Sequence, residues 1–431
     1  FQSPKQRQDL LQPAVDAATP ASVHDALKSA LAPAHRLVLV TGNADLSEKA
    51  GGSPEARIAS EYRRSREVAV QKPEAQEEIE FPYLAAPRGE GKIQQKEVME
   101  DLGITRIVFE NGVTLLAKKT DFKANEVQAA VSFGYGEAAE PESNPALSEM
   151  ARKVVNLSGL GQLDKEALKQ ALAGKNTGVG FHIEEDKFVL AGSCVPDEVR
   201  LLFELLYAHL LDPGFRKSAH GLAIDQFEQQ YDSLAHSVQG AMPLEGQRFL
   251  AGGDTRFGLP ELAVLKQTDL ESIEKWLDPA FDYAPVEIAI VGDFNMDQVI
   301  SNAATFFGTL PERTGKRMPQ RLKAPDFPEG GHLEVSVPTR IQKGLLLVAY
   351  PTTDIWDIHL TRRLSVLSDV FSDRMRIRIR EKLGASYAQA AYNSPSRIYP
   401  DYGIFNTYVI IDPEDVQIVE FLSHQMNEKS F

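Results

Sequence analysis

Two stretches of the chain, residues 21–46 and 271–296, share one order of apolar and polar positions at an offset of 250 residues. In each, three apolar positions four residues apart come first, which indicates one face of a helix. A strand with alternating apolar residues follows and ends at a glycine that permits a turn. The sequence therefore predicts the same helix–strand–turn module twice, with a chance likeness between two common units as the alternative. The matching positions are Val23, Leu27, Leu31, Val38, Val40 and Gly42 in the first copy and Ile273, Leu277, Phe281, Ile288, Ile290 and Gly292 in the second.

The placement of the two copies suggests how the chain is divided. The first copy begins near residue 1 with no sheet before it, so we expect residues 1–46 to be the tail of a preceding α/β domain. Residues 47–103 are rich in Gly, Pro and Glu, which is typical of a linker. We expect residues 104–315 to form a complete α/β domain and residues 316–431 to form the first part of the last one. The chain is thus predicted to be part of a longer protein.

Several elements are predicted within these two domains. Asn111–Gly112 lies between two apolar runs, a strong signal for a β-hairpin over residues 105–119. A further unit opens with residues 331–338 and 344–351, and an apolar stripe at 360–371 predicts a helix. In residues 374–380, arginine alternates with methionine and isoleucine, which fits a strand as well as a helix.

Composition and charge exclude several classes of protein. The net charge is −15 and no basic stripe is present, so we expect no nucleic-acid partner. The longest apolar run, residues 201–211, is too short to cross a bilayer, so no membrane span is predicted. The single cysteine, Cys194, excludes an intramolecular disulfide and a cluster of thiolate ligands, and its strand-like surroundings favour a core position.

The histidine spacing excludes one common kind of zinc site. None of the nine histidines lies four residues from another, so neither H-E-x-x-H nor H-x-x-E-H occurs in this chain. The nearest cluster of possible metal ligands is His182, Glu184 and Glu185. Strand alternation would place His182 and Glu184 on one face, but a solvated strand end is the favoured interpretation. No metal ligand is therefore predicted in this chain.

The stretch RIREKLGASY, residues 378–387, is the most informative for chemistry. Arg380 and Tyr387 flank a predicted turn at Gly384. A guanidinium, which is always charged, and a phenol hydroxyl could both reach a peptide carbonyl or a developing oxyanion. A structural tyrosine with a surface arginine is the alternative, and on the residues alone it is the favoured interpretation, since clustered arginines are usually solvated.

The same stretch, with residues 402–416 after it and residues 287–313 before it, resembles the insulinase/pitrilysin family of zinc metallopeptidases, relatives of the mitochondrial processing peptidase. The resemblance covers residues 104–431, and residues 1–46 resemble the end of a preceding half. It implies an α+β fold of repeated mitochondrial-processing-peptidase-like domains, each a mainly antiparallel sheet with packed helices. In the family, four such domains form two halves that close around a peptide.

The family's site residues can be carried over only where this sequence matches. The R-x6-Y pattern of the fourth domain falls on Arg380 and Tyr387, which implies catalytic and substrate-binding roles for both. The family's zinc helix falls on residues 144–155, where Ala146 and Met150 occupy the histidine positions and Glu149 remains. There the periodicity predicts a helix that starts with Pro145 at N1, with Glu149 solvated. Its predicted buried stripe is Leu147, Met150, Ala151, Val154 and Val155.

The resemblance implies the C-terminal half of a zinc endopeptidase, inactive alone, with zinc bound by the missing N-terminal half. Its partners would be a peptide substrate and that zinc-binding half of the same chain. One alternative is a non-catalytic structural or binding protein of the same fold. Another is a subunit that supplies only the arginine–tyrosine side to a separate zinc subunit. The linker-like residues 47–103 favour a single chain, and the likeness of long bacterial members to exported proteins suggests the periplasm.

Overall fold

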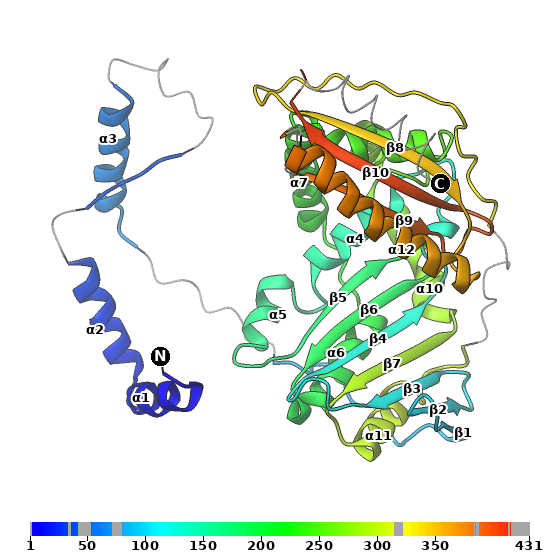
Figure 1. Ribbon diagram of the computed structural model, residues 1–431. Coiled ribbons are helices and arrows are strands. Elements are labelled where there is room, and N and C mark those ends of the chain that lie inside the picture. Colours follow the sequence, from blue (N-terminus) through cyan, green and yellow to red (C-terminus); the bar gives the residue numbers. More distant parts are fainter. Residues whose placement is uncertain are drawn as a thin grey trace. The chain divides into compact units, whose positions relative to one another are not determined.

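The structure is a computed structural model that describes residues 2–32, 36–41, 53–70, 80–313, 322–382, 384, 388–412 and 414. The chain divides into two compact units, Phe1–Gln76 and Glu77–Phe431, and each unit is described by itself. Figure 1 shows both units and labels all strands and most of the helices.

The described part of the first unit forms the helices α1 (Pro4–Asp16), α2 (Pro20–Leu31) and α3 (Pro54–Glu67), none of which buries a residue. Helix α2 confirms the helix of the first copy, whereas residues 36–41, where a strand was predicted, form none. A strand needs a neighbour for its backbone groups, and the described residues of this unit include no other strand. Helix α3 lies within the segment interpreted as a linker.

The second unit contains a seven-stranded sheet with the order β1-β2-β3-β7-β4-β6-β5. Neighbouring strands are antiparallel, except for the parallel pair β3 and β7. The strands are β1 (Ile93–Met99), β2 (Ile104–Phe109), β3 (Thr114–Lys119), β4 (Val127–Phe133), β5 (Gly178–Ile183), β6 (Phe188–Cys194) and β7 (Val286–Gly292).

Two local predictions are confirmed in this sheet. Strands β2 and β3 form the predicted antiparallel hairpin, and Gly112 has a φ of +86° in its turn. The second copy of the module is helix α10 (Leu270–Tyr283) followed by β7. Gly292 closes it with a φ of +139°, and a Cβ there would lie 2.2 Å from the Glu126 carbonyl oxygen. This turn therefore requires glycine.

Helices cover one face of the seven-stranded sheet. In β4, Val127 and Val131 are fully buried while Gln128 between them is exposed, so the two faces have different surroundings. Cys194 lies in this core, which confirms its predicted position, and burial raises the pKa of its thiol to about 12. The helices that contribute to the core, besides α10, are α4 (Leu147–Ser158), α6 (Val199–Leu211), α7 (Lys217–Ala235), α9 (Leu262–Gln267) and α11 (Met296–Phe306). Shorter elements are the 3-10 turns η1 (Gly136–Ala139), η2 (Pro196–Glu198) and η3 (Val238–Gly240), the π-helical turn η4 (Met242–Gly246), and helices α5 (Lys165–Ala171) and α8 (Gln247–Leu250).

Residues 80–92 pack against this unit, although composition predicted a linker through residue 103. Phe81, Tyr83 and Leu84 contact a small apolar cluster formed by Leu160, Leu163, Leu205 and Ala208. The Tyr83 hydroxyl donates a hydrogen bond to Asp212 Oδ2 at 2.6 Å. Strand β1, also inside the predicted linker, pairs with β2. Residues 80–99 are thus ordered by a few apolar contacts and by pairing with β2, although their composition is typical of a linker.

We expect Tyr83→Phe to lower the free energy of unfolding of the second unit by about 1 kcal/mol, because the Asp212 carboxylate loses a partly buried donor. Chemical denaturation measures the effect. Tyr283→Phe is the matched control, since Tyr283 is 65% exposed, and it should leave the unfolding midpoint unchanged. Equal midpoints for the two variants would show that the hydrogen bond does not stabilise this segment.

The three-stranded sheet has the antiparallel order β8-β10-β9, with β8 (Gly344–Thr352), β9 (Ala388–Pro395) and β10 (Gly403–Ile411). Helix α12 (Ile358–Met375) packs on β9 and continues into the π-helical turn η5 (Arg376–Lys382). Residues 374–380, which fitted a strand or a helix, are therefore helical. Residues 331–338, with which the last unit was expected to open, form no strand. Both sheets with their helices confirm the α+β fold class.

Candidate functional site

Helix α4 contains the residues on which the sequence resemblance places the family's zinc helix, and its apolar stripe is buried as predicted. Ala146 and Met150, at the two histidine positions, are 0% exposed. Leu147, Ala151, Val154 and Val155 are buried in the same core cluster. The helix begins at Leu147, two residues after the predicted N1 proline, and Asn144 accepts a hydrogen bond from the Thr268 hydroxyl at 2.9 Å.

Glu149 is less accessible than the sequence predicted. Its side chain is 21% exposed and forms an ion pair with Arg152 on the next turn of α4. The chain after β4 folds over the start of the helix, and the Ser148 N–H donates to Glu140 Oε1 at 2.7 Å. The prediction of a solvated carboxylate is therefore wrong, because helical periodicity gives the direction of a side chain but not the loop that lies over it.

Glu137, in turn η1, lies near the carboxylates of Glu140, Glu149 and Glu185, and these four residues form an acidic group. Burial raises the pKa of its carboxyl to about 7, and the charges of Glu140, Glu149 and Glu185 raise it further than Arg152 lowers it. Burial also raises the pKa of Glu140. The turn is fixed by its backbone, because the Glu137 N–H donates to the Glu184 carbonyl at 2.9 Å. This fold therefore places four carboxylates near one another with one nearby guanidinium.

The cluster of possible metal ligands named in the sequence analysis borders this group and shares Glu185 with it. His182, Glu184 and Glu185 are exposed, as a solvated strand end predicts, and Glu184 pairs with Lys187 at 3.2 Å. In the part of the chain that the structure describes, no group of three or more His, Cys, Asp or Glu residues could hold a metal ion.

Arg380 lies in η5, directly after α12, with an exposed side chain. Its carbonyl accepts a hydrogen bond from the Gly384 N–H at 3.1 Å, and Gly384 has a φ of +66°, which agrees with the predicted turn. Tyr387 lies outside the described residues. The pairing of the arginine with the tyrosine therefore stays a prediction.

An aromatic contact that the sequence analysis missed joins the loop around residue 257 to the loop before β10. The Phe257 ring lies 5.4 Å from the ring of Tyr399 and 5.8 Å from that of Tyr402. The Arg256 guanidinium lies 4.7 Å from the centre of the Tyr399 ring, and Arg256 Nε donates to Asp254 Oδ1 at 3.0 Å. The two tyrosines at 399 and 402 could have indicated an aromatic contact, but the sequence did not reveal that Phe257 is their partner.

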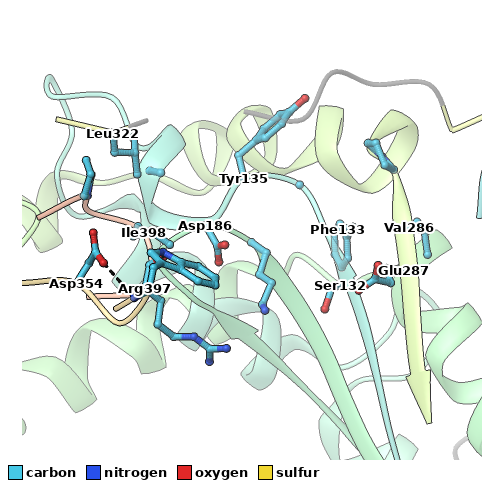
Figure 2. A pocket seen from close by; sticks show the side chains of 16 residues that line it. Ser132, Phe133, Tyr135, Asp186, Val286, Glu287, Leu322, Asp354, Arg397 and Ile398 are labelled. Atoms are coloured by element: carbon cyan, nitrogen blue, oxygen red, sulfur yellow. Dashed lines mark hydrogen bonds between the residues drawn. The ribbon is translucent and has the colours of Figure 1, made fainter. Parts of the chain in front are cut away.

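A cavity of about 730 Å³ lies beside this contact, between the two sheets of the second unit. Figure 2 shows Phe133 and Val286 on one side and Asp354, Arg397 and Ile398 on the other. Trp356, which also lines the cavity, is 75% exposed, and its indole N–H donates to the Arg397 carbonyl at 3.1 Å. The cavity is lined by aromatic and aliphatic side chains together with acidic and basic ones. The volume of the cavity is within the usual range for a ligand site. Such walls can contact a polypeptide segment.

Among the described residues, no helix is both long enough and apolar enough to span a membrane.

We compared the chain with known protein families, curated proteins and solved structures. Residues 269–428 match the family model for the peptidase M16 inactive domain. The chain is 22% identical over 421 residues to the probable zinc protease PqqL of Haemophilus influenzae, which covers 95% of the chain and 43% of that protein. The chain spans less than half the length of the curated relatives it matches.

Solved structures share the fold. The periplasmic protease PqqL from Escherichia coli superimposes with a TM-score of 0.63 at 15% identity, over 88% of this chain and 41% of that one. A peptidase M16 inactive domain from Pseudomonas fluorescens gives a TM-score of 0.61 at 16% identity, over 74% of this chain and 77% of that one. Residues 269–428 are therefore similar to the peptidase M16 inactive domain, and the chain as a whole is similar to a probable zinc protease, as the sequence resemblance predicted.

Proposed function

We propose that this chain is the non-zinc, C-terminal half of a zinc-dependent endopeptidase, and that it binds and orients peptides in a chamber closed by a zinc-binding half. The observation that carries this proposal is the burial of Ala146 and Met150 in α4. At the two positions where the family has imidazole ligands, this chain has side chains that stabilise the core. Helix α4 therefore serves packing in this half.

Zinc does not fit the residues of this helix. Met150 is enclosed by the core and offers a thioether, whereas zinc in proteins is bound by thiolate, imidazole or carboxylate. Glu149 is engaged by Arg152. We therefore assign the metal to the other half of the intact protein, where it would supply a polarised carbonyl and an activated water.

Arg380 and Tyr387 would act on the peptide from this side. A guanidinium and a phenol hydroxyl are both hydrogen-bond donors, and donors set at the carbonyl oxygen stabilise the charge that develops there. The exposed side chain of Arg380 in η5 supports this role, because it lies at the surface of the second unit. The cavity lined by Trp356 and Arg397 offers a further surface for the bound polypeptide.

The proposal is tested by zinc content and peptide cleavage of two samples, the longer protein that carries this chain and the chain alone. We expect about one zinc per molecule and chelator-sensitive cleavage in the longer protein, and neither in the chain alone. Stoichiometric zinc in the chain alone would contradict the assignment. A longer protein with neither zinc nor cleavage would favour the non-catalytic alternative, and cleavage that needs a separate zinc-binding subunit would favour the partner-subunit alternative.

A further inference from the structure

Another cavity, of about 890 Å³, lies on the face of the seven-stranded sheet that the core helices leave open. Along β4, Gln128 and Ala130 line this cavity, whereas Val127 and Val131 point into the core and are fully buried. The lining residues come from the neighbouring strands β2, β3, β7, β4, β6 and β5 (Figure 1). None of them lines the cavity beside Trp356, so the two cavities are separate surfaces of this unit.

The floor of the open-face cavity is formed by small residues that lie opposite one another on adjacent strands. Ala130 of β4 pairs with Ala289 of β7 on one side and with Ala191 of β6 on the other. Gly180 of β5 is the partner of Ala191, and Leu116 of β3 is the partner of Ala289. Residues that lie directly opposite in a sheet share a face. The floor is therefore an apolar groove across four strands that ends at the larger side chain of Leu116.

The two glycines of β5 that line the groove are not required by the backbone or by packing. Neither Gly178 nor Gly180 has a positive φ. A Cβ at Gly178 would meet no atom within 4 Å, and the nearest atom to a Cβ at Gly180 would be 3.5 Å away. Glycine weakens the interior of a strand and often marks a place where a ligand or another backbone approaches closely. We therefore attribute these glycines to the space that they leave above the sheet.

Lys118 is the one charged side chain among the described residues that line the groove. It lies in β3, two residues after Leu116, and in the part of the chain that the structure describes its ammonium has no ion-pair partner. Arg106, which lies opposite Leu116, differs because it pairs with Glu97 at 3.8 Å. The groove is therefore complementary to a molecule that combines apolar groups with a negative charge.

We propose that this groove binds a polypeptide segment whose bulky apolar side chains lie on the small residues of the floor and whose neighbouring carboxylate pairs with Lys118. The volume of about 890 Å³ is within the range of ligand sites and leaves room for a few apolar side chains. The inference rests on the proposed function, since it takes the bound molecule to be a peptide. It adds the class of peptide, which has apolar residues next to aspartate or glutamate.

The test measures binding to the intact chain without zinc, so it does not depend on cleavage. A fluorescently labelled peptide with a core of leucine and phenylalanine flanked by aspartates is titrated by anisotropy, beside a peptide with the same core flanked by lysines. We expect saturable binding of the aspartate peptide and at least about tenfold weaker binding of the lysine peptide. A longer protein without zinc and cleavage would remove the proposed function and leave this binding in place. Absence of saturable binding, or equal binding of the two peptides, would overturn this inference alone.

Ala289→Phe should weaken binding of the aspartate peptide at least about tenfold, because the ring occupies the floor of the groove. Ala289 is exposed on the open face, so the variant should fold normally. Ala235→Phe, at an exposed position of α7, is the matched control and should bind like the parent. Equal binding by Ala289→Phe and the parent would show that the peptide does not occupy the groove.

Lys118→Glu should reverse the preference, so that the lysine peptide binds more tightly than the aspartate peptide. Lys119→Glu is the matched control, since the next residue of β3 is exposed and does not line the groove. It should keep the preference of the parent. An unchanged preference in Lys118→Glu, or the same change in both variants, would overturn the role of Lys118. Tighter binding of a fluorescent fatty acid than of the aspartate peptide would assign the groove to a small amphiphile and overturn the inference as well.

Discussion

Arg380→Ala, made in the longer protein that carries this chain, should reduce kcat for peptide cleavage roughly 100-fold while KM changes little. A donor preset at a developing oxyanion contributes about 3 kcal/mol to the transition state, and this interaction strengthens only as charge develops. Tyr387→Phe removes the second donor and should have an effect of the same size. Steady-state kinetics on one fluorogenic peptide measures both. The prediction rests on the proposed function and on the family's R-x6-Y pattern.

The matched control is Arg378→Ala. Arg378 lies in the same π-helical turn, is exposed like Arg380 and does not belong to the motif. Its removal should leave kcat within about twofold of the parent, since surface charges away from a site contribute little. Thermal unfolding of the variants should match the parent because the Arg380 side chain is exposed. Equal kinetics for Arg378→Ala and Arg380→Ala would remove the site assignment.

The elements that the sequence predicted are those whose pattern is local. The helix and strand of the second module could be predicted because Ile273, Leu277 and Phe281 recur at helical spacing and the strand ends at Gly292. Met150 was assigned to the core for the same reason, and it is fully buried. Periodicity carries this information, since it fixes which side chains share a face before any tertiary contact forms.

The features that the sequence did not predict depend on contacts between distant segments. Tyr83 meets Asp212 across 129 residues, so a segment with linker composition is ordered by a partner that its own sequence does not reveal. Phe257 meets Tyr399 across a similar span, and no local pattern connects them. The prediction that Glu149 is solvated failed for a more local reason, because helical periodicity does not reveal the turn just before the helix, where Glu140 accepts a hydrogen bond from the Ser148 N–H.

The raised pKa of Glu137 leads to a prediction about stability. An ordinary glutamate has a pKa of 4.5, whereas burial and the neighbouring carboxylates raise the pKa of Glu137 to about 7. Between pH 4.5 and pH 7, the folded protein therefore keeps a proton on Glu137 that the unfolded chain has already released. The free energy of unfolding therefore falls as the pH rises from about 4.5, and the loss is complete above about pH 7. Each pKa unit corresponds to about 1.4 kcal/mol, so the penalty is about 3.5 kcal/mol at its upper limit.

Glu137→Gln should remove this penalty, because an amide keeps the shape of the neutral acid and cannot ionise. We expect the variant to be more stable than the parent by up to about 3.5 kcal/mol at pH 8 and nearly equal to it at pH 4.5. Urea unfolding of both proteins across this pH range measures the difference. Glu329→Gln, at an exposed position, is the control and should leave the pH dependence unchanged. A difference between Glu137→Gln and parent that does not grow between pH 4.5 and 7 would show that the four carboxylates are too far apart or too well solvated to hold a proton. The grouping of Glu137 with Glu140, Glu149 and Glu185 would then have no electrostatic consequence.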